Sequence, residues 1–151
     1  MVWGISCHVK GNDCTVVILA VTGNDGELKG EEILRHKTSP GEDWPQKLHG
    51  LATHIETLLR KSAPNAAVMR SMDYFAKQRK TILKSRYQVE GVVIVTLRRS
   101  VERTEARSGR EIGDILGMDK PATEIEAARL FGKDYKEEGA AALAALRIAE
   151  R

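Results

Sequence analysis

The chain has 151 residues, 42% of them hydrophobic and 30% charged, with a net charge of +3, a balance that excludes a mostly disordered chain and fits one domain. Its longest apolar runs, residues 16–21 and 91–97, fall far short of the ~20 residues that cross a bilayer. Its first residues hold no signal-peptide core, and its two cysteines cannot form a disulfide framework. We therefore expect a single soluble cytoplasmic domain over residues 1–151 with no membrane segment.

The first forty residues predict a meander of three antiparallel strands. The expected strands are residues 2–9, 14–21 and 27–38. The second is rich in β-branched residues, which favour strands, and a turn containing Gly11 and Asn12 joins it to the first. A second turn at residues 23–26 leads into the third strand, which alternates loosely and is expected to be more exposed.

The next segment has the apolar spacing of a helix. Leucine and isoleucine recur three or four residues apart between residues 48 and 59, which places them on one helix face. We expect a helix over residues 43–61, with Pro45 near its start, where a missing backbone N–H is tolerated. Residues 66–70 are short and apolar and predict a buried strand parallel to the first.

Periodicity leaves the structure of residues 77–99 open. The run from Gly91 to Leu97 has the β-branching of a strand, whereas Leu83, Tyr87 and Gly91 lie four residues apart, as on one face of a helix. From the residues alone, this segment can be either a strand or a helix.

The remaining residues predict short elements and a helical tail. The expected elements are a strand at residues 101–106 and helices at residues 109–118, 122–130 and 139–151. A break is expected at Lys120-Pro121, and the last helix is predicted from its six alanines, two leucines and one isoleucine.

Four stretches carry motifs in a specific order along the chain. They are Val2-Trp3-Gly4-Ile5-Ser6, residues 64–70, residues 87–93 and residues 137–144. They resemble the ribonuclease H-like superfamily, especially its RuvC-like branch of Holliday junction resolvases. The Gly11-Asn12-Asp13 turn is also similar to a small bacterial family of unknown function in this superfamily. The resemblance implies an α/β fold with a five-stranded mixed sheet flanked by helices, and a helix over roughly residues 79–97.

The resemblance also implies a nuclease centre in which carboxylates hold two divalent metal ions. At the positions matching the family's acids this chain has Ser6, Arg70 and Gly139: a neutral hydroxyl, a permanent cation and no side chain. We therefore predict no catalytic residue, no metal ligand and no cofactor. The alternative is a displaced nuclease site that uses Asp73 and Glu138 with Mg²⁺ or Mn²⁺.

Arg70 has two interpretations. It either replaces the metal with a fixed positive charge that binds phosphate, or it pairs with Asp73 or Glu138 and satisfies the end of a strand. The residues leave both open.

The other candidates for chemistry are weak. Cys7 and Cys14 form no CxxC motif and are expected to be small core or surface residues. His49 and His54 lie five residues apart, so they point to different sides of a helix and make a poor metal pair.

The charge of the chain is concentrated in its centre. Residues 70–110 hold 11 Lys/Arg against 4 Asp/Glu, a net charge of +7, while residues 1–69 and 111–151 are slightly acidic. Only Asp73 and Glu90 are acidic partners within residues 70–99, and the nearby aromatic residues Tyr74, Phe75 and Tyr87 can stack on bases. The candidate nucleic-acid-binding residues are Arg70, Lys77, Arg79, Lys80, Lys84, Arg86, Arg98 and Arg99.

These observations predict a catalytically inactive ribonuclease H-like domain that binds DNA, RNA or a nucleic-acid-associated partner. The metal-dependent nuclease with a displaced site is the first alternative. The second is a protein-interaction or self-assembly domain, such as a homodimer, that uses a sheet edge or the Ala/Leu tail.

Overall fold

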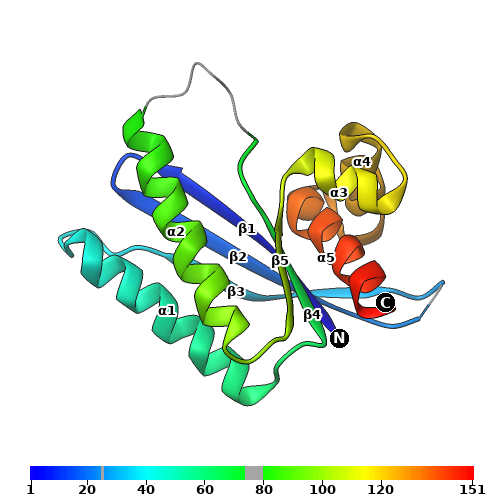
Figure 1. Ribbon diagram of the computed structural model, residues 1–151, viewed down its shortest axis with the longest axis horizontal. Helices are drawn as coiled ribbons and strands as arrows, with labels where there is room; N and C mark the ends of the chain where they lie inside the picture. Colours follow the sequence, from blue (N-terminus) through cyan, green and yellow to red (C-terminus); the bar gives the residue numbers. More distant parts are fainter. Residues whose placement is uncertain (25, 74–79) are drawn as a thin grey trace.

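Five strands form one mixed sheet with helices on both faces in the computed structural model, which describes residues 1–24, 26–73 and 80–151 (Figure 1). The strands are β1 (Val2–Lys10), β2 (Asp13–Thr22), β3 (Lys29–Lys37), β4 (Ala66–Arg70) and β5 (Arg103–Arg107). The helices are α1 (Trp44–Lys61), α2 (Lys80–Arg98), α3 (Gly109–Leu116), α4 (Lys120–Phe131) and α5 (Lys136–Ala149), with a 3₁₀ turn at Lys133–Tyr135. The predicted α/β fold class is confirmed.

The sheet has the order β3-β2-β1-β4-β5. The predicted meander is confirmed, because β1 pairs antiparallel with β2, and β2 with β3. Gly11 adopts a φ of 62° in the turn between β1 and β2, a left-handed conformation that favours glycine. Strand β4 pairs parallel with β1, as predicted, and its register places Ser6 beside Arg70.

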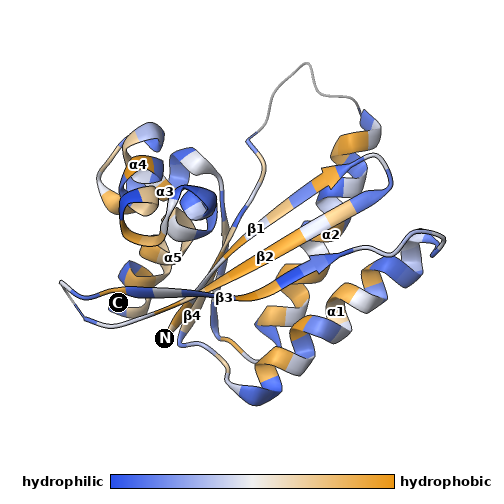
Figure 2. Cartoon of the chain, turned by 180° about the vertical axis from the view of Figure 1, so that it is seen from behind, coloured by the Kyte–Doolittle hydropathy of each residue, from blue (hydrophilic) through white to orange (hydrophobic). Residues whose placement is uncertain are grey.

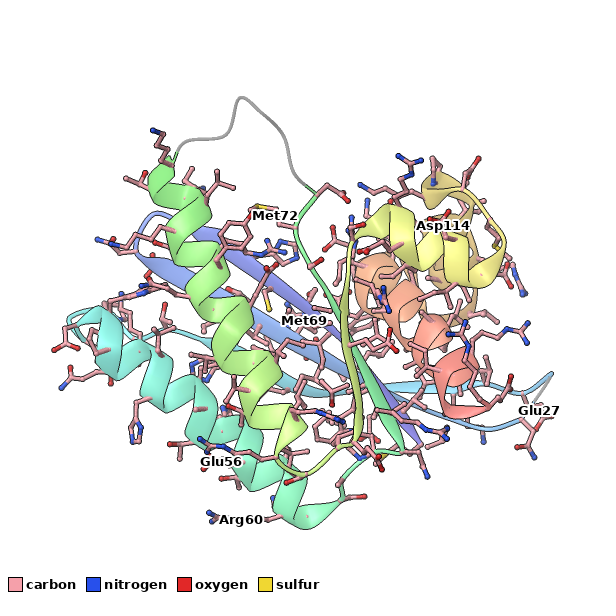
Figure 3. All side chains as sticks on the ribbon, in the orientation of Figure 1. Glu27, Glu56, Arg60, Met69, Met72 and Asp114 are labelled. Atoms are coloured by element: carbon pink, nitrogen blue, oxygen red, sulfur yellow. The ribbon has the colours of Figure 1, made fainter. Side chains whose placement is uncertain are left out.

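Two separate cores lie on the two faces of the sheet. Helices α1 and α2 cover one face over Trp3, Ile5 and Met69, and helices α3, α4 and α5 cover the other (Figure 3). Strands β1 and β2 are apolar along most of their length, because both of their faces are buried (Figure 2). No helix in the described part of the chain is both long enough and apolar enough to span a membrane.

Residues 80–98 form a helix, so the strand interpretation of residues 91–97 is wrong. The buried side chains Val89, Val93 and Leu97 recur at intervals of four and pack into the core shared with α1. The predicted face was misplaced, because Tyr87 is 53% exposed. Burial of one helical stripe here outweighs the strand preference of β-branched residues.

The predicted break at Lys120-Pro121 is also wrong, because helix α4 begins there. Asp119 caps the helix by accepting the backbone N–H of Ala122, and Pro121 occupies the first turn, where it needs no hydrogen-bond partner.

The alanine-rich helix α5 lies directly on the sheet. Its buried alanines are Ala140, Ala141, Ala142, Ala144 and Ala145. The small side chains bring the helix backbone close to Gly4 of β1, whose missing Cβ leaves room for the carbonyl of Glu138. The buried alanines of this tail are covered within the chain, and self-assembly through the tail or a sheet edge stays a prediction.

Candidate functional site

The candidate site lies beside the middle of β1, where β4 ends and α5 begins. The register pairs Ser6 of β1 with Arg70, the last residue of β4, and both side chains are buried. The Ser6 hydroxyl donates a hydrogen bond to the buried carboxylate of Glu138 in the first turn of α5. Gly139, the third position that matches the family's acids, packs against Phe131 and Ala127.

Arg70 forms the centre of this site. Its side chain is only 7% exposed, and its guanidinium donates to the Asp73 carboxylate at 2.9 Å and to the carbonyl of Ser71 at 3.1 Å. The guanidinium lies against Gly109, where a Cβ would approach Nη2 to 2.5 Å. The structure therefore shows the predicted pair of Arg70 with Asp73, and not one with Glu138.

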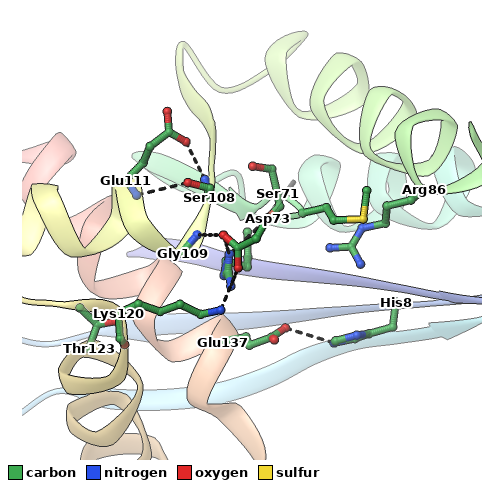
Figure 4. Close-up of polar contacts among 12 residues, drawn as sticks. His8, Ser71, Asp73, Arg86, Ser108, Gly109, Glu111, Lys120, Thr123 and Glu137 are labelled. Atoms are coloured by element: carbon green, nitrogen blue, oxygen red, sulfur yellow. Dashed lines mark hydrogen bonds and ion pairs between the residues drawn. The ribbon is translucent and has the colours of Figure 1, made fainter. Parts of the chain in front are cut away.

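Asp73 joins three elements through its carboxylate (Figure 4). Besides the Arg70 contact, it accepts hydrogen bonds from Lys120 Nζ at 2.8 Å and from the backbone N–H of Gly109 at 3.2 Å. Burial raises the pKa of Asp73, but the hydrogen bonds and charges of Arg70 and Lys120 outweigh that effect and lower the pKa to about 2. Asp73 is therefore ionised at neutral pH and holds the starts of α3 and α4 against the end of β4.

The neighbouring acids are also partnered. Glu137 lies 3.3 Å from Nε2 of His8, and this contact lowers the pKa of Glu137 (Figure 4). Glu90 of α2 accepts hydrogen bonds from Arg86 at 3.0 Å and from the backbone N–H of Met72 at 2.9 Å. His8, Arg70, Asp73, Arg86, Lys120 and Glu137 line an open hollow of about 240 Å³.

The donor set does not fit the metal centre that the resemblance implies. Two-metal sites need several ionised oxygens that converge without a competing cation. Here the Arg70 guanidinium stands at the matching strand position and shares the Asp73 carboxylate with the Lys120 ammonium, while Glu138 accepts the Ser6 hydroxyl. Within the described residues no group of three or more His, Cys, Asp or Glu side chains is arranged to hold a metal ion.

The predicted basic residues fall into two groups. Lys80 and Lys84 are exposed in the first turns of α2, at the end of the molecule where β1 and β4 finish (Figure 1). Arg98 lies about 21 Å from Lys84 along the helix, at 1.5 Å per residue, and the adjacent Arg99 pairs with Glu56 of α1 at 3.1 Å. Lys77, Arg79, Tyr74 and Phe75 lie outside the described residues.

Most of the paired cations of the basic segment are partnered by acids close to them in the sequence, and Glu56 of α1 is a partner from a distant segment. The ion pairs of this segment include Arg70–Asp73, Arg86–Glu90, Arg99–Glu56 and Arg107–Glu105. Among the described residues, Lys80, Lys84 and Arg98 have no ion-pair partner. The net charge of +7 therefore overstates the charge available to a ligand.

Sequence analysis missed Lys120, His8 and Gly109 as members of the site. Lys120 is 47 residues from Asp73, and no spacing rule connects the two. Gly109 directly follows Ser108, a serine that caps a helix, and this pattern could have been noticed in the sequence. Only the fold shows that the Arg70 guanidinium occupies the space that a side chain at residue 109 would need.

Cys7 and Cys14 are both buried in the core, one of the two places predicted for them. Burial raises the pKa of the Cys7 thiol far above its usual range and that of Cys14 to about 11. We expect neither thiol to react with Ellman's reagent in the native protein at pH 8, and both to react after denaturation in urea. Rapid release of one equivalent or more of thionitrobenzoate from the native protein would contradict their buried, protonated state.

The sequence matches no protein-family model and no curated protein sequence. Its structure is similar to that of RuvC from Thermus thermophilus, with a TM-score of 0.70 at 17% identity, covering 99% of this chain and 95% of that one. The same RuvC in complex with a Holliday junction substrate gives a TM-score of 0.67 at 17% identity, covering 99% and 94%. The yeast mitochondrial Holliday junction resolvase gives 0.57 at 12% identity, covering 99% and 78%.

These similarities show the fold: the sheet and its flanking helices have the ribonuclease H-like arrangement found in RuvC and related Holliday junction resolvases. The resemblance to a small bacterial family of unknown function stays a prediction. At such low identity, function must be argued from the site.

Proposed function

We propose that this chain is a non-catalytic nucleic-acid-binding module that needs no divalent metal. The observation that supports it is the network in which Asp73 binds Arg70 and Lys120 at the edge of the sheet where the resemblance places a metal centre. The Arg70 guanidinium is only 7% exposed and is paired with Asp73, so it fills the place of a metal ion without activating water, and phosphate contacts fall to the exposed cations beside it.

The proposed binding surface runs from the hollow to the first turns of α2. Lys80 and Lys84 are exposed, Lys120 is 40% exposed, and Arg86 lines the hollow. Such cations contact the phosphate backbone regardless of base sequence. Tyr87 lies among them on α2 and offers an exposed ring to an unpaired base.

A four-way DNA junction is the appropriate probe, because one of the similar structures is RuvC bound to a Holliday junction substrate. We expect fluorescence polarisation to show salt-sensitive binding that is unchanged by EDTA. The double variant Lys80→Glu/Lys84→Glu is expected to bind at least ~10-fold more weakly at ~50 mM salt, and its slope of log K against log[salt] should be shallower by about 2.

The matched control is Arg98→Glu/Arg99→Glu, which reverses the same number of charges at the far end of the same helix. We expect it to retain most of the affinity. Absence of binding by the wild-type chain at ~50 mM salt would refute the proposal, since electrostatic contacts are strongest there. Equal losses in both double variants would show that net charge, and not this surface, governs binding.

The nuclease alternative predicts cleavage, which a cleavage assay on the same junction tests. With Mg²⁺ or Mn²⁺ we expect no cleavage of junction, flap or single-stranded substrates, because Asp73 and Glu138 are both engaged by other groups. Cleavage that disappears in Asp73→Ala or Glu138→Ala would establish the displaced site. It would also replace the non-catalytic proposal.

A further inference from the structure

An open groove of about 670 Å³ lies at the opposite end of β2 from the hollow, beside the loop that joins β2 to β3. This loop and the C-terminal half of α5 form two of its walls and lie side by side in both views (Figures 1 and 2). Helix α4 and the end of α3 complete the groove. Its apolar lining comes from the exposed Met118 and from half-buried leucines, which are Leu28, Leu116, Leu130, Leu143 and Leu146.

Helix α5 has an alanine side and a leucine side. Its alanines are buried against the sheet, whereas Leu143 and Leu146 line the groove and stay half-buried. On the neighbouring helix α4, Ile125 is 70% exposed and lies one turn before Arg129, which lines the groove. An apolar groove with an exposed apolar side chain next to it is typical of a surface that another protein covers.

Two ion pairs flank this apolar surface. Glu126 pairs with Arg129 on α4, and Arg147 pairs with Glu150 on α5. All four residues line the groove, and their charges cancel. The order of the charges is reversed between the two helices, with the acid first on α4 and the base first on α5. When α4 of one copy lies along α5 of another in the same direction, each glutamate therefore faces an arginine, and in the opposite direction like charges meet.

We propose that two copies of this chain form a twofold dimer through this groove, with the Ile125 side chain of each copy seated in the groove of the other. A twofold interface uses one surface patch twice, so the patch must be complementary to itself. Here the groove supplies the cavity, Ile125 supplies the side chain that fills it, and the reversed charge order sets the direction of the helices. A strongly acidic or strongly basic partner would instead place like charges against half of this rim.

The dimer goes beyond the proposed function and does not rest on it. The groove lies among α3, α4 and α5, on one face of the sheet, whereas α2 covers the other face. Lys80 and Lys84 in the first turns of α2 therefore stay exposed in both copies. Each copy keeps its own proposed nucleic-acid surface.

Sedimentation equilibrium of the purified chain without DNA tests this proposal. We expect the wild type to dimerise with a Kd in the micromolar range, and Ile125→Glu to dimerise at least ~10-fold more weakly, because it puts a charge into the apolar groove. The matched control is Val95→Glu, since Val95 is also a β-branched side chain, 57% exposed, but belongs to α2. We expect this control to dimerise like the wild type, and circular dichroism checks that both variants are folded.

Charge reversal tests the direction of the helices. Arg147→Glu is expected to weaken the dimer, because its carboxylate faces Glu126 of the other copy, and the double variant Glu126→Arg/Arg147→Glu is expected to restore it. The proposal is overturned by a chain that stays monomeric at ~100 μM, by a dimer that persists in Ile125→Glu, or by a double variant no tighter than Arg147→Glu. Loss of the dimer in Val95→Glu alone would place the interface on α2 instead. Because no DNA is present, this proposal and the proposed function fail independently.

Discussion

Replacing Gly4 with alanine is expected to lower the free energy of unfolding by about 3 kcal/mol, the upper range for overpacking a core. A Cβ at this position would lie 1.9 Å from the carbonyl oxygen of Glu138 and 2.5 Å from the amide nitrogen of Ala142. Both are backbone atoms of α5, so the helix must move off the sheet to admit the methyl group. Urea denaturation followed by circular dichroism measures the loss.

Gly91→Ala is the matched control for this substitution. Gly91 lies within helix α2, and a Cβ there would meet no atom within 4 Å. Alanine is therefore expected to stabilise the protein by about 0.5–1 kcal/mol through helix propensity. Equal stabilities for the two variants would contradict the close approach of α5 to β1.

The substitution Asp73→Asn is expected to cost about 2 kcal/mol at neutral pH. It leaves the Arg70 guanidinium, only 7% exposed, without its anionic partner, and it also removes the partner of Lys120. Breaking a fully buried ion pair costs about 3–5 kcal/mol, and the partial exposure of Asp73 reduces that figure. The control is Glu126→Gln, which breaks the exposed pair with Arg129 and is expected to have no measurable effect.

The Asp73 contribution should depend on pH with a defined sign. The pKa of Asp73 is lowered to about 2 in the folded protein from an ordinary value of 3.8, so the ionised form is favoured by folding. Its stabilisation is complete above about pH 5 and is lost as the pH falls from about 4 to about 2. The stability difference between wild type and Asp73→Asn should therefore shrink across that interval, and a constant difference would show that the carboxylate charge is unimportant.

Local sequence signals were sufficient where one face or one turn decides the structure. Helix α1 begins as predicted because Asp43 and Gln46 cap it reciprocally and Pro45 fits its first turn. Arg70 and Asp73 are three residues apart, so their pairing was within reach of sequence analysis. Residues 91–97 have the composition of a strand but form part of helix α2, because the buried side chains of this helix pack into the core.

The sequence by itself determined the three-stranded meander, helix α1, strand β4 and the position of the basic segment, and it left residues 91–97 open between strand and helix. The match of Ser6, Arg70 and Gly139 to the family's acids is what the resemblance implies. Only the tertiary structure decided which charges remain available, because partners such as Lys120 for Asp73 and Glu56 for Arg99 come from distant segments. The reason is physical: hydropathy and turn preference act over a few residues, whereas ion pairs depend on how packed elements bring distant side chains within about 3 Å.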